Sequence, residues 1–300
     1  MDLLLARTLL EVVSSGNFVQ AASRLHVTQS AVSLRIKKLE NELGRLVFVR
    51  HKNGVALTAA GQQFLRYAGA LSRVWEEARH QVAVPPGYRD SLVVGGQYSL
   101  WPNLLMRWSA RLERNLPDVA FRAELGMPDR LMRQMMDGVL DIGVMYMPQL
   151  RPGLEVETLM EDELVLVSTD PNAGPRLDER YVYIDWGPEF QAAHALRYPK
   201  YANPGTTLAI GALGLNFVMD NGRSGYFPTR VVQRHLESGR LTLVPDAPAF
   251  PYPAYVVYHS DGDHEIVDHA LTFLRDVATD VDDRQREVVA DLDTLGSEPA

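Results

Sequence analysis

A short polar stretch near the N-terminus has the residue types that recognise DNA bases. Gln29, Ser30 and Ser33 would share the outward side of a helix that begins after Thr28. Glutamine can pair with adenine, and serine can donate to or accept from a base edge. The basic residues that follow suit phosphates, and they are Arg35, Lys37 and Lys38. With Thr28, these residues form the first part of a predicted surface for double-stranded DNA.

A basic hairpin is predicted directly after this helix. Asn53-Gly54 is a favoured two-residue hairpin turn, and the apolar runs 47–49 and 55–57 would be its strands. The basic residues before the turn are Arg50, His51 and Lys52. We expect a wing whose basic side chains contact the DNA backbone or a neighbouring minor groove.

Capped helices would hold both features in place. Asn17 can cap one helix and Thr28 can cap a second, which ends at Gly44. The apolar positions are Ala21, Ala22 and Leu25 in the first helix and Val32, Ile36, Leu39 and Leu43 in the second. With a preceding helix over residues 3–14, the pattern predicts a winged helix-turn-helix whose second helix enters the major groove. The alternative is an ordinary helical hairpin with a basic, solvated surface.

A long gapless motif spans residues 28–61. It comprises Thr28-Gln29-Ser30-Ala31-Val32-Ser33, Ile36, Leu39-Glu40, Leu43-Gly44, Phe48, Arg50, Leu57-Thr58 and Ala60-Gly61. This motif resembles the N-terminal signature of the LysR-type transcriptional regulators, with a departure at Val47, where leucine is usual. Ser99-Leu100-Trp101 and residues 185–191 also resemble the subgroup of the flagellar master-operon repressor HdfR. The resemblance implies a sequence-specific DNA-binding regulator that is not an enzyme, with RNA polymerase as a partner if it activates transcription.

The composition limits the class of protein. The chain has 300 residues and is 46% hydrophobic, which is enough for more than one core. It has no cysteine, which excludes disulfides and thiolate metal sites, and we expect neither a metal nor a cofactor. The N-terminus lacks the basic region of a signal peptide, and no apolar run is long enough to span a bilayer. We therefore expect a cytoplasmic protein without a membrane partner.

The charge is distributed unevenly along the chain, whose formal net charge is −8. Residues 1–88 contain 11 Lys and Arg against 6 Asp and Glu, a net charge of +5, so the rest carries −13. An acidic body repels phosphates, so such a molecule would contact DNA through its basic N-terminal part alone.

Residues 58–84 predict one long helix. Its apolar positions step by four and three residues, and they are Phe64, Ala68, Leu71, Trp75, Ala78 and Val82. Such a heptad pattern is typical of helices that pair. Because the helix is too long to be covered by the N-terminal part, we expect it to form a homodimer. The alternative is that this stripe packs on the protein's own body.

The second half of the chain predicts an α/β domain. Pro85-Pro86-Gly87 breaks the long helix, and residues 85–89 would form a hinge. From residue 90 strands and helices alternate, which predicts parallel sheets covered on both faces. Strands are expected at 92–95, 119–125, 141–146, 164–168, 181–184, 225–227 and 255–259, and helices at 102–115, 128–136, 207–221, 231–237 and 263–277.

The LysR resemblance implies that this domain has two Rossmann-like subdomains of periplasmic-binding-protein type, joined by two crossovers. We place the crossovers near 161–164 and 264–266, so subdomain I covers 90–162 and 266–300, and subdomain II covers 163–265. The expected domains are a winged helix-turn-helix over 1–57, a linker helix over 58–84 and an effector-binding domain over 90–300, with a loose acidic tail after Asp282. The resemblance alone implies a homotetramer.

A small-molecule effector is expected between the subdomains, because open α/β sheets bind ligands at the carboxyl ends of their strands. The candidates are Tyr98, Ser99, Trp101, Met127, Pro128, Tyr146, Trp186, Asn203, Thr206, Tyr226 and Phe227. Ser99 and Pro128 fall at the usual effector contacts of the resembled family, and Ser99 could also cap the helix expected from residue 102. Met127 and Pro128 offer no hydroxyl group to a carboxylate, and the many rings favour an aromatic or apolar effector. The alternative is that these rings simply fill the space between the subdomains.

Enzyme motifs do not emerge from the sequence. There is no Walker loop and no G-x-G-x-x-G, and residues 222–225 lack the spacing of a nucleophile elbow. His264-Glu265 lacks a second histidine at the spacing of a metalloprotease helix. Two other interpretations of the function remain: a LysR-type regulator that responds to no ligand, and a small-molecule receptor or enzyme built on the α/β domain.

Overall fold

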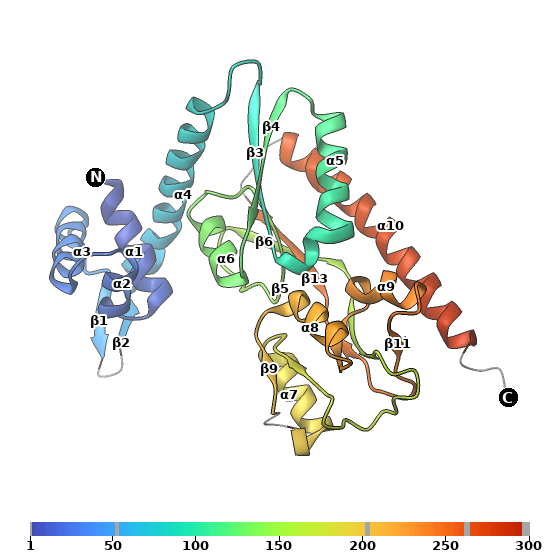
Figure 1. The fold of residues 1–300 in the computed structure, drawn as a ribbon. Helices are drawn as coiled ribbons and strands as arrows, with labels where there is room; N and C mark the ends of the chain where they lie inside the picture. Colours follow the sequence, from blue (N-terminus) through green and yellow to red (C-terminus); the bar gives the residue numbers. More distant parts are fainter. Residues whose placement is uncertain (1, 52–53, 202–204, 261–264, 296–300) are drawn as a thin grey trace.

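The computed structural model describes residues 2–51, 54–201, 205–260 and 265–295. Figure 1 shows three parts: an N-terminal head (residues 2–57), the long helix α4, and an α/β body (residues 90–295). The head lies beside α4 on the side away from most of the body. This arrangement confirms the expected fold class, an N-terminal helical head followed by an α/β domain.

Three short helices form the head, and they are α1 (Leu3–Ser15), α2 (Phe18–Arg24) and α3 (Gln29–Leu43). The Asn17 side chain caps α2, the Thr28 side chain caps α3, and Gly44 ends α3 in the left-handed conformation, as the sequence predicts. Their apolar faces meet in one core that includes Leu9, Val12, Ala21, Val32 and Leu39. Leu43 was expected on the α3 stripe but is 37% exposed, because it lies at the end of the helix beyond this core.

A two-stranded antiparallel wing follows α3, with β1 (Phe48–His51) and β2 (Gly54–Leu57). The register pairs His51 with Gly54, so Gly54 belongs to a strand and not to the turn that the sequence suggested. Val47 precedes the strand and is fully buried in the core of the head. Lys52 and Asn53 lie outside the described residues.

The long helix α4 (Ala59–Val82) begins at the wing, with Thr58 as its cap. Its first half packs on the head, since Phe64 and Ala68 join the core of the head. The expected heptad stripe is therefore not one continuous free surface. In the second half Leu71, Trp75 and Val82 are exposed.

The first subdomain of the body, subdomain I, is built on a five-stranded sheet in the order β4-β3-β5-β13-β6. The strands are β3 (Asp90–Gly96), β4 (Val119–Leu125), β5 (Ile142–Tyr146), β6 (Leu154–Met160) and β13 (Ala254–His259). β3, β4 and β5 are parallel, whereas β13 runs antiparallel to both β5 and β6. The expectation of purely parallel sheets is therefore wrong, because β13 enters the sheet from the opposite direction.

Alternating residues of this sheet serve two separate cores. Leu92 and Val94 of β3 face α5 (Met106–Asn115) and α10 (Glu265–Leu295), while Val93 faces α6 (Pro128–Met136). Figure 1 shows the same arrangement, with α6 on the side of α4 and with α5 and α10 on the other side. The indole nitrogen of Trp108 donates to the Ala270 carbonyl at 2.9 Å, which ties α10 to α5.

The second subdomain, subdomain II, has a smaller antiparallel sheet built around β7 (Glu163–Ser168). Its other strands are β10 (Ser224–Pro228), β11 (Thr242–Leu243) and β12 (Phe250–Pro251), and a separate parallel pair joins β8 (Tyr183–Ile184) to β9 (Thr207–Leu208). The helices are α7 (Pro188–Arg197), α8 (Gly214–Asp220) and α9 (Thr229–Glu237), with short helical turns η3 (Pro199–Tyr201) and η4 (Gly211–Leu213).

The chain crosses between the two sheets twice, and the second crossing differs from the prediction. The first lies at residues 161–162, between β6 and β7, close to the expected place. The second lies at Tyr252 and Pro253, between β12 and β13. The predicted crossover at 264–266 is therefore wrong: β13 already pairs with β5 and β6, so subdomain I starts again at that strand.

Several other element boundaries also differ from the sequence prediction. The helix expected from residue 102 is irregular over η1 (Tyr98–Leu100) and η2 (Trp101–Leu105), because Pro102 is extended and Asn103 has φ +66°; α5 starts at Met106. The helix expected over 207–221 starts only at Gly214, since β9 occupies its beginning. The sequence prediction also lacked β6, α7, β11 and β12. The tail expected to be loose continues as helix α10 to Leu295, in a stretch without glycine or proline.

Candidate nucleic-acid interface and subdomain junction

The outward face of α3 carries the polar residues that the sequence assigned to DNA. Thr28 Oγ1 accepts a hydrogen bond from the Ala31 amide at 3.2 Å, which starts the helix at Gln29. Gln29 and Ser30 are exposed and Ser33 is half-buried, whereas Val32 and Ile36 face the core. The first turns of α3 therefore present side chains that can donate and accept hydrogen bonds on the side away from the protein.

A groove runs between α3 and the wing. It is lined by Gln29, Ser30, Ser33, Leu34, Lys37 and Arg45, together with wing residues such as Val49. The structure thus brings four of the predicted DNA-binding residues together, namely Gln29, Ser30, Ser33 and Lys37. The sequence reasoning missed Leu34 and Arg45, which line the same groove. Arg45 could have been found as a cation placed directly after the helix.

Three other predicted DNA-binding residues, Arg35, Lys38 and His51, do not line this groove. Lys38 is exposed and Arg35 is half-buried, and neither α3 side chain lines the groove. His51 is exposed on β1. Arg50 pairs with Val55 through the backbone, and Lys52 lies outside the described residues. Among the described residues, Arg35, Lys38 and His51 therefore lie on α3 and β1 but outside the lining of the groove.

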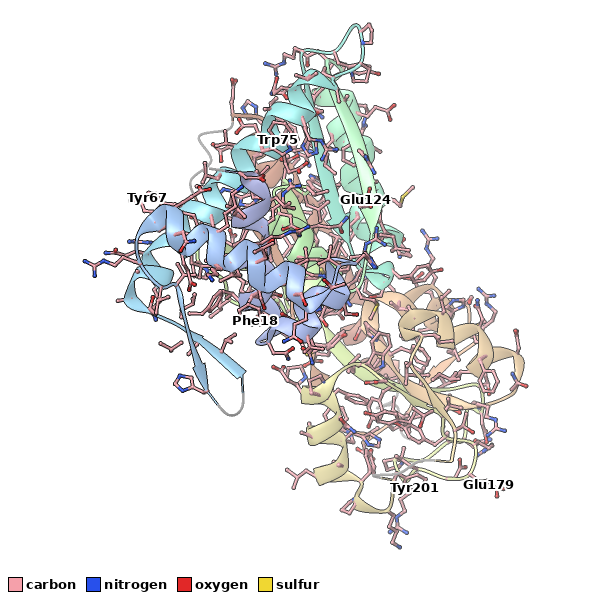
Figure 2. All side chains as sticks on the ribbon, turned by 90° about the vertical axis from the view of Figure 1, so that its left-hand side faces the viewer. Phe18, Tyr67, Trp75, Glu124, Glu179 and Tyr201 are labelled. Carbon is pink, nitrogen blue, oxygen red and sulfur yellow. The ribbon has the colours of Figure 1, made fainter. Side chains whose placement is uncertain are left out.

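Hydrogen bonds between side chains and the backbone fix the wing relative to α3. Glu40 Oε1 accepts hydrogen bonds from the amides of Val47 and Phe48, at 2.9 and 3.4 Å. The Thr58 hydroxyl donates to the Leu46 carbonyl at 2.7 Å. The wing is therefore held at both of its ends, and the width of the groove is set by the folded head. Figure 2 shows the hairpin projecting beyond the helices of the head, with Phe18 near its base.

One exposed face of α4 is strongly apolar. Tyr67 is 64% exposed and Trp75 is 50% exposed, and both are labelled in Figure 2. Leu71, Val74 and Val82 add further exposed apolar surface on the same helix. A run of large apolar side chains on one helix is typical of an interaction surface. The predicted dimerising residues thus divide into two groups: Phe64 and Ala68 belong to the head, and Leu71, Trp75, Ala78 and Val82 are exposed.

α4 also contacts subdomain I of its own chain. The Ser72 hydroxyl of α4 donates to the Asp137 carbonyl at 3.5 Å. The neighbouring Glu76 carboxylate, 3% exposed, pairs instead with Arg7 of the head and with Arg79 of α4 itself. The α6–β5 turn lies against the same helix, because a Cβ added at Gly138 would come within 2.8 Å of the Arg73 Cα. α4 thus packs on its own chain through this polar face, whereas the stripe residues Leu71, Trp75 and Val82, which the alternative placed against the body, stay exposed.

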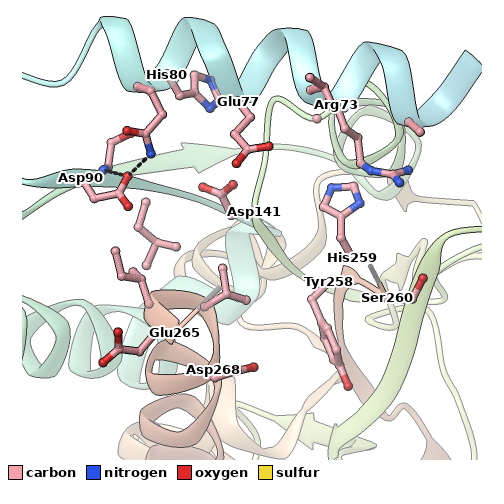
Figure 3. Close-up of a pocket in the computed structure, with 18 of the residues that line it drawn as sticks. Arg73, Glu77, His80, Asp90, Asp141, Tyr258, His259, Ser260, Glu265 and Asp268 are labelled. Carbon is pink, nitrogen blue, oxygen red and sulfur yellow. Dashed lines mark hydrogen bonds between the residues drawn. The ribbon is translucent and has the colours of Figure 1, made fainter. Parts of the chain in front are cut away.

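A polar cavity of about 720 Å³ lies between α4 and subdomain I. Figure 3 shows Arg73, Glu77 and His80 on α4 facing Asp141 and His259 of the body. Burial lowers the pKa of His80, although Glu76 opposes this shift. The charged lining does not match the aromatic or apolar effector that the sequence suggested.

An ion pair lies at the junction between the subdomains. Arg230 is the second residue of α9, and its side chain is 1% exposed. Its guanidinium lies 3.5 Å from the carboxylate of Asp162, donates to the Ser99 carbonyl at 2.5 Å and also donates to the Tyr146 hydroxyl. Arg230 of subdomain II is thus bound to two residues of subdomain I and to the first crossover.

Arg230 and Tyr146 both keep their protons in this buried cluster. Burial alone would lower the pKa of Arg230, but the neighbouring Tyr146 and Asp162 raise it, so the guanidinium is charged. Burial also raises the pKa of Tyr146, which keeps its hydroxyl protonated. Nothing in the sequence points to Arg230 or Asp162, because isolated charged residues are usually solvated.

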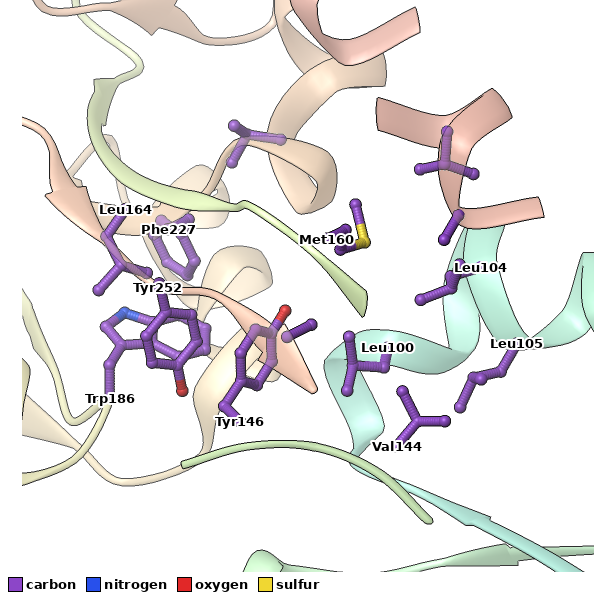
Figure 4. Packing of buried hydrophobic residues seen from close by; sticks show 14 of the residues in the cluster. Leu100, Leu104, Leu105, Val144, Tyr146, Met160, Leu164, Trp186, Phe227 and Tyr252 are labelled. Carbon is purple, nitrogen blue, oxygen red and sulfur yellow. The ribbon is translucent and has the colours of Figure 1, made fainter. Parts of the chain in front are cut away.

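Aromatic rings fill the space next to this cluster. Tyr146 stacks on Tyr252 with ring centroids 4.0 Å apart, and Trp186 meets the edges of Tyr252 and Phe227 (Figure 4). The Trp186 indole donates to the Tyr226 carbonyl at 2.8 Å. Both crossovers contribute to this packing, Asp162 through the ion pair and Tyr252 through its ring. The junction therefore matches the alternative in which the rings fill the space between the subdomains.

The predicted effector residues do not all meet at this junction. Tyr226 faces away from Phe227 along β10, and its hydroxyl lies 3.0 Å from that of Tyr198. Ser99 is buried inside η1 and caps no helix, because the turn that follows it is irregular. Its carbonyl accepts a hydrogen bond from Arg230. Met127 is 68% exposed, and Pro128 begins α6. The remaining positions are Tyr98, which is 45% exposed, Trp101 and Thr206, which are half-buried, and Asn203, which lies outside the described residues.

A search of the described residues finds no group of three or more side chains able to hold a metal ion. Within the same residues, none of the helices is long and apolar enough to cross a membrane.

Comparisons with known proteins cover both halves of the chain. Residues 3–62 match the family model "Bacterial regulatory helix-turn-helix protein, lysR family", and residues 86–279 match "LysR substrate binding domain". The transcriptional regulator HdfR of Escherichia coli is 30% identical over 266 residues, which is 88% of this chain and 94% of the relative. HdfR of Salmonella schwarzengrund matches over the same shares.

Solved structures share the fold. ArgP from Mycobacterium tuberculosis superposes with a TM-score of 0.54 at 22% identity, over 90% of this chain and 96% of that one. LysG from Corynebacterium glutamicum with its bound effector Arg gives a TM-score of 0.55 at 18% identity, over 93% and 99% of the two chains.

Proposed function

This chain belongs to the LysR family of bacterial transcriptional regulators, with a DNA-binding helix-turn-helix and an effector-binding domain. We propose that it controls transcription through sequence-specific binding of double-stranded DNA. The single observation that carries it is the groove between α3 and the wing, where Gln29, Ser30, Ser33 and Lys37 lie together.

In this proposal α3 lies in the major groove. Gln29 and Ser33 contact base edges from the first turns of the helix, where recognition helices make such contacts. Arg35, Lys38, Arg50 and Lys52 contact phosphates and set the register of the protein on the duplex. The head spans residues 1–57, and its net positive charge attracts DNA while the acidic body stays away from it.

The linker helix, residues 58–84, pairs two chains through the exposed residues Leu71, Trp75, Ala78 and Val82. Two-fold pairing places two heads side by side, which fits a DNA site with two related half-sites. Further contacts between effector-binding domains, over residues 90–300, would complete a homotetramer. RNA polymerase is a partner if the protein activates transcription.

The effector acts at the junction between the subdomains. A small molecule that binds one relative placement of the subdomains better than another shifts the population of the whole assembly toward it. Because Arg230 and the rings around Tyr252 already occupy the junction, an effector must displace or reorder them. The same observation supports a second candidate, a regulator that responds to no ligand and acts through its abundance.

The test is a DNA-binding titration of the full-length protein at several salt concentrations. Fragments that adjoin the chain's own gene are compared with random duplex, and bound fragments are footprinted. We expect tight binding over two spaced half-sites, with an affinity that falls as salt rises. Equal affinity for every duplex at every salt concentration would contradict the proposal.

A further inference from the structure

Leu34 is an exposed leucine in the middle of the groove-lining surface of α3. Its side chain is 69% exposed, more than that of most large apolar residues in the head. It lies one helical turn after Ser30 and three residues before Lys37, so the three side chains share one face of the helix. All three line the groove between α3 and the wing.

The core of the head does not use this side chain. Among the described residues, the apolar side chains that pack on that core include Leu25, Val27 and Leu65, but not Leu34. The α3 residues that face the core are Val32, Ile36 and Leu39. Leu34 therefore stays in contact with water in the isolated chain, at a position that a duplex in the groove would cover.

The chemistry of an aliphatic side chain limits what it can recognise. Leucine neither donates nor accepts a hydrogen bond, so it cannot distinguish the amide, carbonyl and ring-nitrogen groups of base edges. The one apolar group that the major groove of unmodified DNA presents is the C5-methyl group of thymine. Contact between the two removes both apolar groups from water.

We propose that Leu34 is a specificity-determining residue that contacts a thymine methyl group in each half-site. This inference rests on the proposed function, because it requires α3 to lie in the major groove. Ser30 and Lys37, on the same face, would place the methyl group between a polar base contact and the backbone. The operator should therefore contain a thymine at one fixed position in each half-site.

The methyl group itself can be removed from the DNA. Bound sites are first selected from a random duplex library with the full-length protein. Each thymine of a selected half-site is then replaced singly by deoxyuridine, which lacks only the methyl group. Affinities are measured for the unmodified protein, for Leu34→Ala and for Leu196→Ala. Leu196 is a matched control, since it is an 85% exposed leucine on helix α7 of the body.

We expect one position per half-site where deoxyuridine weakens binding by about fourfold, as for loss of one buried methyl group. Leu196→Ala should show the same loss, whereas Leu34→Ala should bind thymine and deoxyuridine equally at that position. The inference is overturned if Leu34→Ala keeps every response to deoxyuridine that the unmodified protein shows. Failure to select any site would instead overturn the proposed function, and the inference with it. Retained circular dichroism of Leu34→Ala excludes misfolding as the cause.

Discussion

Arg230 and Asp162 form an ion pair that is shielded from water at the point where the chain crosses between the two subdomains. The guanidinium and the carboxylate are 3.5 Å apart, and their side chains are 1% and 0% exposed. Arg230 comes from subdomain II, while its other partners, the Ser99 carbonyl and the Tyr146 hydroxyl, belong to subdomain I. The relative placement of the subdomains therefore depends on a charge that has no access to solvent.

Removal of the carboxylate should destabilise the body strongly. Asp162→Asn keeps the size of the side chain but leaves the Arg230 charge buried without its partner, which costs about 3–5 kcal/mol in comparable sites. The matched control is Glu157→Gln, which breaks the exposed pair with Arg275 and should cost about 0–1 kcal/mol. Denaturant unfolding of both variants measures the difference. Equal losses would show that the buried pair contributes no more to stability than the exposed one.

A methyl group at Gly138 should disturb the contact between α4 and the body. Gly138 has φ +74°, and an added Cβ would lie 2.8 Å from the Arg73 Cα. Gly222 has φ +63° but nothing within 4 Å, so Gly222→Ala suffers only the backbone strain. We expect Gly138→Ala to lose about 1–3 kcal/mol more than Gly222→Ala, from overpacking. Similar free energies of unfolding for the two variants would mean that α4 can move away from this turn without cost.

The stability of the body should fall below neutral pH because of His194. This residue is 1% exposed, its Nε2 lies 2.8 Å from the Tyr181 hydroxyl, and burial lowers its pKa to about 4. The folded state therefore resists protonation, so the stability present above pH 6.5 is lost as the pH falls toward 4. Between pH 7 and pH 5 the loss should be about 2 kcal/mol.

His194→Gln should remove this particular loss. The difference in unfolding free energy between the unmodified protein and His194→Gln isolates the histidine, because the other titrating groups are common to both. We expect this difference to shrink by the stated amount from pH 7 to pH 5. A difference that does not change with pH would refute the assignment.

A charge on the exposed face of α4 should weaken self-association. Trp75→Glu places a carboxylate in the apolar surface that Leu71 and Val82 continue, so the dimer dissociation constant should rise by at least about tenfold. Leu196→Glu adds the same charge to an exposed site on α7 and serves as the control. Sedimentation velocity over a range of concentrations distinguishes the two, and identical behaviour would exclude this face from the dimer.

Two variants on α3 should separate base recognition from phosphate binding. Gln29→Ala should relax sequence choice at one half-site position by about 1–3 kcal/mol. Lys38→Ala should weaken binding to all sequences alike and lower the salt slope by about one. Titrations on a selected site and its single-base variants, at several salt concentrations, measure both effects. An unchanged sequence preference in Gln29→Ala would exclude it as a base contact.

Much of the head could be predicted from sequence because its structure is locally encoded. Asn17, Thr28 and Gly44 act on residues within one turn of themselves, and the structure places each cap where the sequence predicts it. In the body, β4 and α6 have the predicted bounds for the same reason: Pro128 starts the helix, and Leu131 and Met135 face the sheet. The polar face of α3 follows from helical spacing alone.

The body was harder to predict where partners are far apart in the chain. The strand at 255–259 was found, but nothing in its residues says that it pairs with β5, more than 100 positions earlier in the chain, rather than with subdomain II. That pairing moves the second crossover to Tyr252 and places its ring on Tyr146. Strand partners depend on how all the elements pack together, and short apolar strands are compatible with several neighbours.

The family, the DNA-binding head and the candidate base-contacting residues follow from the amino-acid sequence, because they rest on a contiguous motif and on local helix signals. Which apolar residues of α3 and α4 remain exposed depends on how the elements pack, and so does the filling of the subdomain junction by aromatic rings and Arg230. Leu34 and Val32 are both apolar residues of α3, but the helix directs Val32 into the core and Leu34 toward solvent. Arg230 and Asp162 look like ordinary surface charges until folding brings residues 68 positions apart together and removes the water around them.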